Sequence, residues 1–237
     1  MEQQRLEEIA RQALLEKRKA RGNCMTFSLH ESEHVESCWD GDTTLCVALG
    51  CAGDADCSTS CTALLYDSGG HAWSSGLPKL LHNKLNGRGQ RKHPWPVYLS
   101  MGSLGRYYLQ FADGSYQFCA NEGVQAKLSE LRNISSVSFG ASANSYFIVQ
   151  AAGGYSYSGI PTGMHTAINT NKYKKKCFAN VSLGPGGEWF VRWTDGSWKG
   201  GGWPDDLNER WKELERSGRT VKQILFGPAS TWFIRYS

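Results

Sequence analysis

Hydrophobic and polar positions along this chain follow a motif that recurs several times. The clearest copy reads VSLGPGGEWFVRWTDGSW and runs from Val181 to Trp198. Further copies, the last one shortened, begin at Val47, Tyr98, Val137 and Ile224. The first glycines of the copies are 38 to 52 residues apart. A period of this length predicts one supersecondary unit that is repeated along the chain.

Each unit predicts a run of short strands. Alternation within Trp189–Trp193 places Trp189, Val191 and Trp193 on one face of a strand and Phe190 with Arg192 on the other. A turn motif follows these aromatic runs, and its copies are Asp113-Gly114-Ser115, Ala152-Gly153-Gly154 and Asp195-Gly196-Ser197. Asp-Gly between two strand-like runs indicates a hairpin, since glycine tolerates positive φ. A third short strand is expected after each turn.

Each unit is also expected to end in a helix. The first-turn prolines that favour a helix start are Pro78, Pro161 and Pro204. The strongest helix spans Asp205–Ser217, where Leu207, Trp211 and Leu214 lie at helical spacing and Gly218 follows as a C-cap. The unit is therefore predicted to be strand–strand–strand–helix.

Short antiparallel sheets at this period are typical of propeller blades, so we predict a mainly β fold with short helices. The expected architecture is a propeller-like ring of about five blades. Cys24–Leu29 is predicted to pair with the strand at Trp232–Tyr236, so that the N- and C-terminal strands close the ring. An open stack of repeats is the alternative. The predicted domains are an N-terminal helix at 1–22 and one repeat domain at 23–237.

The segment LGPGGEWFVRWTDGSWKGGGWPDDL resembles a group of largely uncharacterised eukaryotic repeat proteins. Their unit is L/F-G-P-x-G-x-W-F, followed by D-G-S-W and L-P-x-x-L. The resemblance covers Leu45 to Ser237 and weakens in the first unit. It implies a propeller-like fold and no particular activity.

The formal net charge of +4 conceals a segregation of charges. Eight acidic residues and no Lys or Arg lie between Gly22 and Pro78, whereas Lys172–Lys176 holds four basic residues. Such stretches are either solvated loops or a basic patch for an anionic partner, either a nucleic acid or a membrane surface. Lys174, Lys175 and Lys176 are the candidate contacts.

Cysteines are concentrated in the first unit. A Cys-rich insertion follows Gly50, and the loop group consists of Cys46, Cys51, Cys57 and Cys61. These residues are expected to be free or buried thiols, a disulfide staple or zinc ligands, and the sequence leaves these three alternatives open.

A second group of metal-ligand residue types lies upstream and consists of Cys24, His30, His34 and Cys38. If this segment is helical, His30, His34 and Cys38 share one face, which suits tetrahedral zinc. No cofactor is otherwise expected. A metal-dependent protein centred on these residues is one alternative function.

No nucleophile elbow, phosphate loop or other catalytic signature is found in the chain, which favours a non-enzymatic protein. Most tryptophans recur at structural positions and are expected in the core. Aromatic residues at loop tips would instead suit a lectin-like, carbohydrate-binding propeller.

The N-terminal segment predicts an amphipathic helix whose apolar stripe includes Leu6, Ile9, Ala13 and Leu14. This stripe is expected either to dock on the repeat domain or to bind a protein partner or another subunit. The segment is not typical of a signal or transit peptide, so an intracellular, cytoplasmic protein is expected. Together these features predict an interaction module that docks into a larger assembly.

Overall fold

The computed structural model describes residues 24–29, 33–37, 44–51, 60–66, 71–74, 76–86, 94–170 and 176–237. The fold of this part is mainly β, with four short helices. The strands of the first half are β1 (Cys24–Leu29), β2 (Glu33–Ser37), β3 (Thr44–Cys51), β4 (Ser60–Tyr66), β5 (His71–Trp73), β6 (Pro96–Met101), β7 (Tyr107–Phe111) and β8 (Tyr116–Cys119). Those of the second half are β9 (Ile134–Phe139), β10 (Tyr146–Gln150), β11 (Tyr155–Ser158), β12 (Phe178–Leu183), β13 (Trp189–Trp193), β14 (Trp198–Gly201), β15 (Val221–Phe226) and β16 (Trp232–Tyr236). The helices are α2 (Lys79–Asn86), α3 (Glu122–Glu130), α4 (Thr162–Asn169) and α5 (Asp205–Arg216).

The predicted strand–strand–strand–helix order is confirmed from β3 to α5. Consecutive strands pair antiparallel in small sheets, namely β3-β4-β5, β6-β7-β8, β9-β10-β11 and β12-β13-β14. The strongest predicted helix is observed as α5, and Gly218 follows it with a φ of 69°, in the left-handed region that a C-terminal glycine favours.

The last sheet joins the two ends of the described chain in the order β15-β16-β1-β2. Strand β1 pairs antiparallel with β16, from Cys24 opposite Tyr236 to Ser28 opposite Trp232. The predicted pairing of Cys24–Leu29 with Trp232–Tyr236 is therefore confirmed. The helix considered for the following segment is wrong, because Glu33–Ser37 forms β2, whose backbone pairs with β1.

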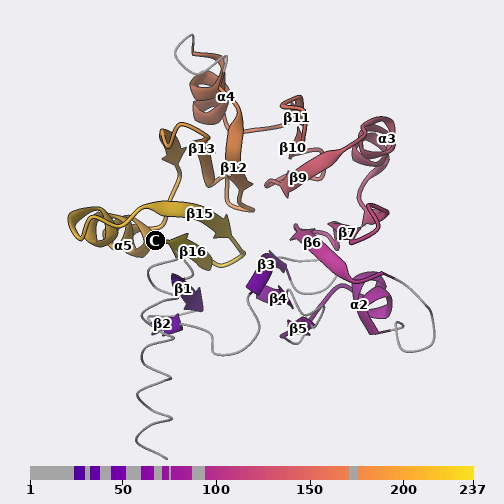
Figure 1. Cartoon of the computed structure of the whole chain (residues 1–237), viewed down its shortest axis with the longest axis horizontal. Coiled ribbons are helices and arrows are strands. Elements are labelled where there is room, and N and C mark those ends of the chain that lie inside the picture. Colours follow the sequence, from indigo (N-terminus) through magenta and orange to yellow (C-terminus); the bar gives the residue numbers. More distant parts are fainter. Residues whose placement is uncertain are drawn as a thin grey trace, which may run out of the picture.

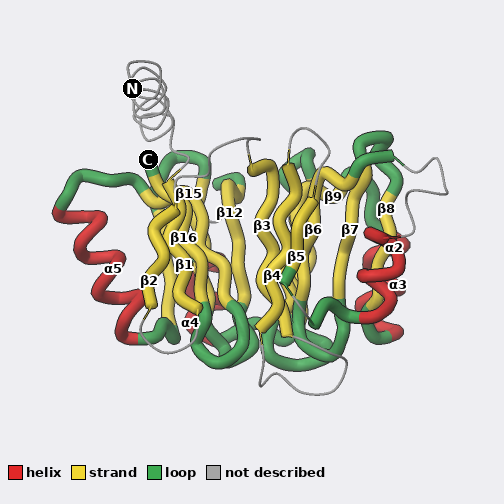
Figure 2. Tube along the Cα trace, turned by 90° about the horizontal axis from the view of Figure 1, so that it is seen from below, coloured by secondary structure: helices red, strands yellow, loops and turns green. Residues whose placement is uncertain are grey.

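The sheets lie around a common centre, with the helices on the outside (Figure 1). The first strand of each unit is innermost, and β3, β6, β9, β12 and β15 each contact the next in this order, while β15 also contacts β3. The strands run between two faces of the molecule (Figure 2). We name the face where the inner strands begin the start face, and the opposite one, where the repeat glycines end these strands, the glycine face.

The repeat glycine is required by close approach of neighbouring sheets. A Cβ added to Gly102 would lie 2.5 Å from the Cβ of Phe139, and one added to Gly184 would lie 2.7 Å from the Cβ of Phe226. A Cβ on Gly227 would lie 3.5 Å from the Cβ of Leu49, which places the end of β15 against β3. The inner strands therefore pack backbone against side chain at the glycine face.

Each helix fills the space between two successive sheets. In α5, Leu207, Trp211 and Leu214 are buried against Phe190 of β13 and Ile234 of β16. Equivalent clusters hold Leu81 of α2, Leu128 of α3 and Ile168 of α4. Trp193 and Trp232 are fully buried, as the core role of the repeat tryptophans predicts.

Candidate anion-binding surface

The centre of the molecule holds a cavity of about 60 Å³, lined by residues of the inner strands. Toward the start face its lining includes the polar side chains of Ser136, Asn180 and Gln223, together with Tyr98. This volume holds a few water molecules and is much smaller than a usual small-molecule pocket. The surface around the cavity is therefore a better candidate site than the cavity itself.

Two arginines lie one strand outward from the polar lining. Arg192 of β13 is opposite Asn180 of β12, and Arg235 of β16 is opposite Gln223 of β15. Neighbouring strands are about 4.8 Å apart. Both arginines therefore lie one strand outward from lining residues of the cavity at the start face.

These arginines depart from the repeat. The equivalent partners of the inner strands in the other three sheets are Leu65, Gln110 and Val149. The core requires no cation at this position, since apolar or neutral residues occupy it elsewhere. The two arginines are therefore candidates for a role beyond packing.

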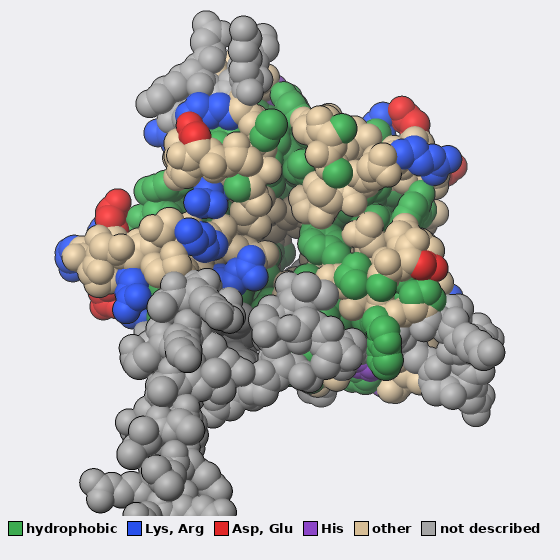
Figure 3. Space-filling view, viewed as in Figure 1, with side chains coloured by type: hydrophobic (Ala, Val, Ile, Leu, Met, Phe, Trp, Pro, Cys, Tyr) green, Lys and Arg blue, Asp and Glu red, His purple; other side chains and the backbone are tan. Residues whose placement is uncertain are grey.

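Lys222 adds a third cation at the start of β15, at the irregularity in pairing between Val221 and Gln223. We name Arg192, Lys222 and Arg235 the cationic rim. All three side chains are half-buried, and within the described part of the chain none of them has a hydrogen bond or an ion pair. Basic side chains gather over β12, β13, β15 and β16 on the start face, beside the central hollow (Figure 3).

Arg106 shows how this fold satisfies an arginine that has a structural role. Its guanidinium is buried and donates to the carbonyl oxygens of Ser103, Gly140, Ser142, Ala143 and Ser145. These bonds tie the turn before β7 to the turn before β10. Burial lowers the pKa of Arg106 to about 10, so the group stays charged at neutral pH.

Arg235 is also partly desolvated, but none of the described residues accepts a hydrogen bond from it. Burial lowers the pKa of its guanidinium, and the nearby Cys46 thiol opposes this shift. A cation that loses water without gaining a partner is electrostatically unfavourable. An incoming anion would supply the missing interaction.

An exposed tryptophan lies directly beside the cationic rim. Trp198 of β14 is the cross-strand partner of Arg192, so both side chains lie on the same face of their sheet. Its ring packs on Trp211, with 4.1 Å between ring centroids, and stacks on Trp203 at 5.8 Å. Trp198 nevertheless remains 37% exposed, which gives the surface a fixed apolar element.

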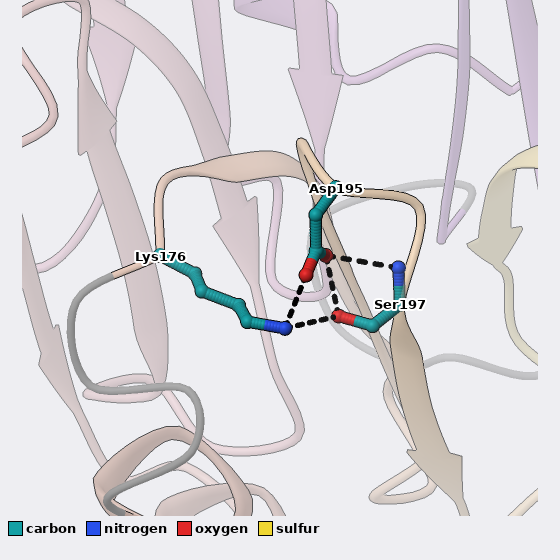
Figure 4. Close-up of polar contacts among 3 residues, drawn as sticks. All are labelled: Lys176, Asp195 and Ser197. Atoms are coloured by element: carbon teal, nitrogen blue, oxygen red, sulfur yellow. Dashed lines mark hydrogen bonds and ion pairs between the residues drawn. The ribbon is translucent and has the colours of Figure 1, made fainter.

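The predicted basic stretch at 174–176 is not part of the cationic rim. Lys174 and Lys175 lie outside the described residues, whereas Lys176 Nζ forms an ion pair with Asp195 and a 3.2 Å hydrogen bond to Ser197 Oγ (Figure 4). The Lys176 ammonium, with the hydroxyl and amide of Ser197, holds the pKa of the Asp195 carboxyl well below its usual range. This carboxylate is therefore engaged by Lys176, although it follows Arg192 closely in the sequence.

The four cysteines of the predicted loop group are not all in the same chemical state. Cys46 and Cys61 are buried free thiols, Cys51 is disulfide-bonded, and Cys57 lies outside the described residues. Cys46 links two sheets, since its thiol donates to Leu99 O at 3.3 Å and accepts from Leu99 N at 3.4 Å. These contacts give Cys46 a packing role.

The predicted zinc group cannot adopt its helical arrangement, since His34 lies in strand β2. Cys24 lies in β1, and its side chain, like those of His30, His34 and Cys38, lies outside the described residues. Among the described side chains no group of three or more His, Cys, Asp or Glu is arranged to hold a metal ion. Zinc binding by this group stays a prediction.

The predicted apolar stripe of Leu6, Ile9, Ala13 and Leu14 also lies outside the described residues. None of the helices in the described ranges is long and apolar enough to span a bilayer. Comparisons of the chain with protein-family models, curated proteins and solved structures find no match. The resemblance of the repeat to a protein family therefore stays a prediction.

The cationic rim is not evident from the sequence. Its three members are far apart along the chain, and none belongs to a basic run. The available signal was the repeat itself, since aligning its copies shows arginine at one strand position in only the last two. Strand pairing was needed to show that this position lies directly opposite residues that line the central cavity.

Proposed function

We propose that this protein is a non-enzymatic interaction module built on a five-bladed, propeller-like ring. The pairing of β1 with β16 and the approach of Gly227 to Leu49 support closure of the ring. The module would dock into a larger assembly through its loop surfaces and its N-terminal helix. The observation that carries the proposal is the cationic rim, whose three cations form no ion pair with the described residues and lie on one face of an otherwise repetitive scaffold.

Quantitative co-purification from the native source tests this function. A tagged variant with Arg192→Gln, Lys222→Gln and Arg235→Gln should lose specific partners that the wild-type protein retains. Lys199→Gln is the control for loss of charge, because Lys199 is exposed on β14 and pairs with Val191, which places it on the opposite face of the same sheet. Identical partner sets for all variants would contradict a role for the rim.

Removal of residues 1–22 tests the proposed role of the N-terminal helix. The truncated protein should remain folded but associate less with its assembly. Retention of the full assembly by the truncated protein would show that this segment is not needed for docking.

One observation favours carbohydrate binding as a second function. Tyr155 and Trp198 begin the third strands of successive sheets and are 39% and 37% exposed, so they offer equivalent aromatic surfaces. Sugar rings stack on such surfaces. Screening of glycans against wild-type protein and against a variant with Tyr155→Ala and Trp198→Ala tests this function, which predicts a bound glycan that the variant loses.

A further inference from the structure

On the start face, the last two sheets carry the cationic rim and, beside Arg192, the ring of Trp198, while Arg235 lies on the side of β16 that faces β3. We propose that this surface binds an acidic peptide segment of another protein. Carboxylates of the segment would pair with Arg192, Lys222 and Arg235, and one apolar side chain would pack on Trp198. This inference names the partner of the interaction module and therefore rests on the proposed function.

The positions of the three cations suit an extended peptide. Arg192 lies on β13, which contacts β15, and Arg235 lies on β16, the pairing partner of β15. The three cations therefore follow one another across neighbouring strands, with Lys222 on the strand between the arginines. Side chains on one side of an extended chain are about 7 Å apart. Acidic residues at alternate positions could then meet successive cations.

The rim favours an acidic partner because no described residue forms an ion pair with it. Asp195 is the nearest acidic residue to Arg192 along its sheet, and it is engaged by Lys176 and Ser197. Arg210 and Glu213 pair with each other on α5. Carboxylates from a partner would thus form charge-assisted hydrogen bonds without displacing an existing pair of the rim.

Trp198 favours a peptide over a polyanion that offers charge alone. Its ring is held by Trp203 and Trp211, so little conformational entropy is lost when a side chain packs on it. Fixed tryptophan and arginine side chains are the residue types that dominate binding energy at protein interfaces. A protein that binds duplex DNA with strong salt dependence makes roughly six to ten phosphate contacts, more than these three cations can provide.

Fluorescence anisotropy tests the inference on the full chain, with a short fluorescein-labelled peptide that has Glu at three alternate positions, Ser between them and Leu two positions after the last Glu, so that Glu and Leu lie on the same side of the extended peptide. We expect saturable binding that weakens with added salt, and no binding of the same peptide with Gln in place of Glu. Arg192→Gln and Lys222→Gln should each weaken binding by roughly tenfold, while Lys199→Gln leaves it unchanged. Trp198→Ala should weaken binding of the Leu-containing peptide but not that of a Glu–Ser peptide.

Labelled oligothymidine distinguishes the alternative partner. Tighter binding of oligothymidine than of the acidic peptide, with the same loss in Arg192→Gln, would overturn the peptide assignment. Equal affinity of the wild-type protein for the Glu and Gln peptides would also overturn it. If the peptide fails to bind while co-purified partners still depend on the rim, the interaction module stands and only the partner chemistry is wrong.

Circular dichroism and thermal unfolding show whether each variant is folded as the wild-type protein is. Burial lowers the pKa of Arg235, and this residue faces the packed boundary with β3, so Arg235→Gln is compared only when its unfolding midpoint matches that of the wild-type protein. If Arg235→Gln is unstable, the binding measurements on Arg192→Gln and Lys222→Gln still test the inference.

Discussion

At the residue scale, the repeat glycines show how one missing side chain permits contact between sheets. Gly102 has no positive φ that would require glycine, so its role is steric. The neighbouring atom is the Cβ of Phe139, which cannot move without its backbone. Glycine therefore recurs in the sequence because neighbouring sheets approach each other closely at this position, and not only because a turn follows.

Gly102→Ala is expected to destabilise the protein by about 1–3 kcal/mol, because the new methyl group would overlap Phe139 and force the sheets apart. Urea denaturation measures the change. Gly123→Ala is the matched control, since Gly123 lies in α3 with only Asn144 Oδ1 at 4.0 Å from the added Cβ. It should stabilise the protein by up to about 1 kcal/mol. Equal effects of the two substitutions would contradict the steric explanation.

The buried thiols predict a pH dependence of stability. Burial raises the pKa of Cys46 and of Cys61 from 9.0 to about 11. Between these values the unfolded thiols ionise while the folded ones stay neutral, so the free energy of unfolding falls as pH rises. Each thiol should contribute a loss of about 2 kcal/mol by pH 11.

Urea titrations from neutral pH to about pH 11 check this dependence. A variant with Cys46→Ala and Cys61→Ala should be less stable at neutral pH, because side-chain atoms are lost from the core, but should show a shallower decline above pH 9. Parallel declines in the two proteins would contradict the assignment to these thiols.

At the scale of elements, each helix is held by both sheets that it separates. The first turn of α5 shows this most directly. Asp206 accepts a hydrogen bond from Trp232 Nε1 of β16 at 2.8 Å and another from the Leu207 amide at 2.8 Å. One carboxylate thus satisfies a helix terminus and a fully buried indole, and this fixes α5 against the last sheet.

Asp206→Ala should cost about 1–3 kcal/mol, because the Trp232 indole nitrogen would lose this acceptor. Thermal unfolding and the tryptophan emission spectrum report the change. Asp205→Ala alters the same helix turn at an exposed position and should cost less than about 0.5 kcal/mol. A cost for Asp205→Ala as large as that for Asp206→Ala would assign the effect to the helix dipole instead.

At the scale of the whole molecule, one boundary between sheets differs from the others. Helices α2 to α5 each pack between two sheets, but Val47, Leu49 and Leu64 pack directly against Phe233 between the first sheet and the last. In the last sheet β1 is paired on both sides, by β16 and by β2. We therefore expect β1 to hold this boundary together.

Truncations test this expectation. A protein that begins at residue 23 should keep the wild-type unfolding midpoint within a few degrees. A protein that begins at residue 30 lacks β1, and its midpoint should fall by at least about 10 °C, because β16 loses a pairing partner and gains an open edge. Similar midpoints for both truncations would show that β1 is dispensable.

The sequence by itself determined the repeated unit, because strand alternation, Asp-Gly turns and helix-start prolines are local signals. The helix α5 and the pairing of β1 with β16 followed from such patterns. The segment at Glu33–Ser37 did not, since its spacing of His and Cys suits a helix and only pairing with β1 makes it a strand.

Only the tertiary structure decided where the charges meet. Lys176 belongs to the basic run that the sequence emphasised, yet Asp195 pairs with it. Arg192, Lys222 and Arg235 are dispersed in sequence and lie on the neighbouring strands β13, β15 and β16 because the last two sheets pack side by side around the centre. Local patterns specify each unit, but the surface at their junction depends on how the units pack around the centre.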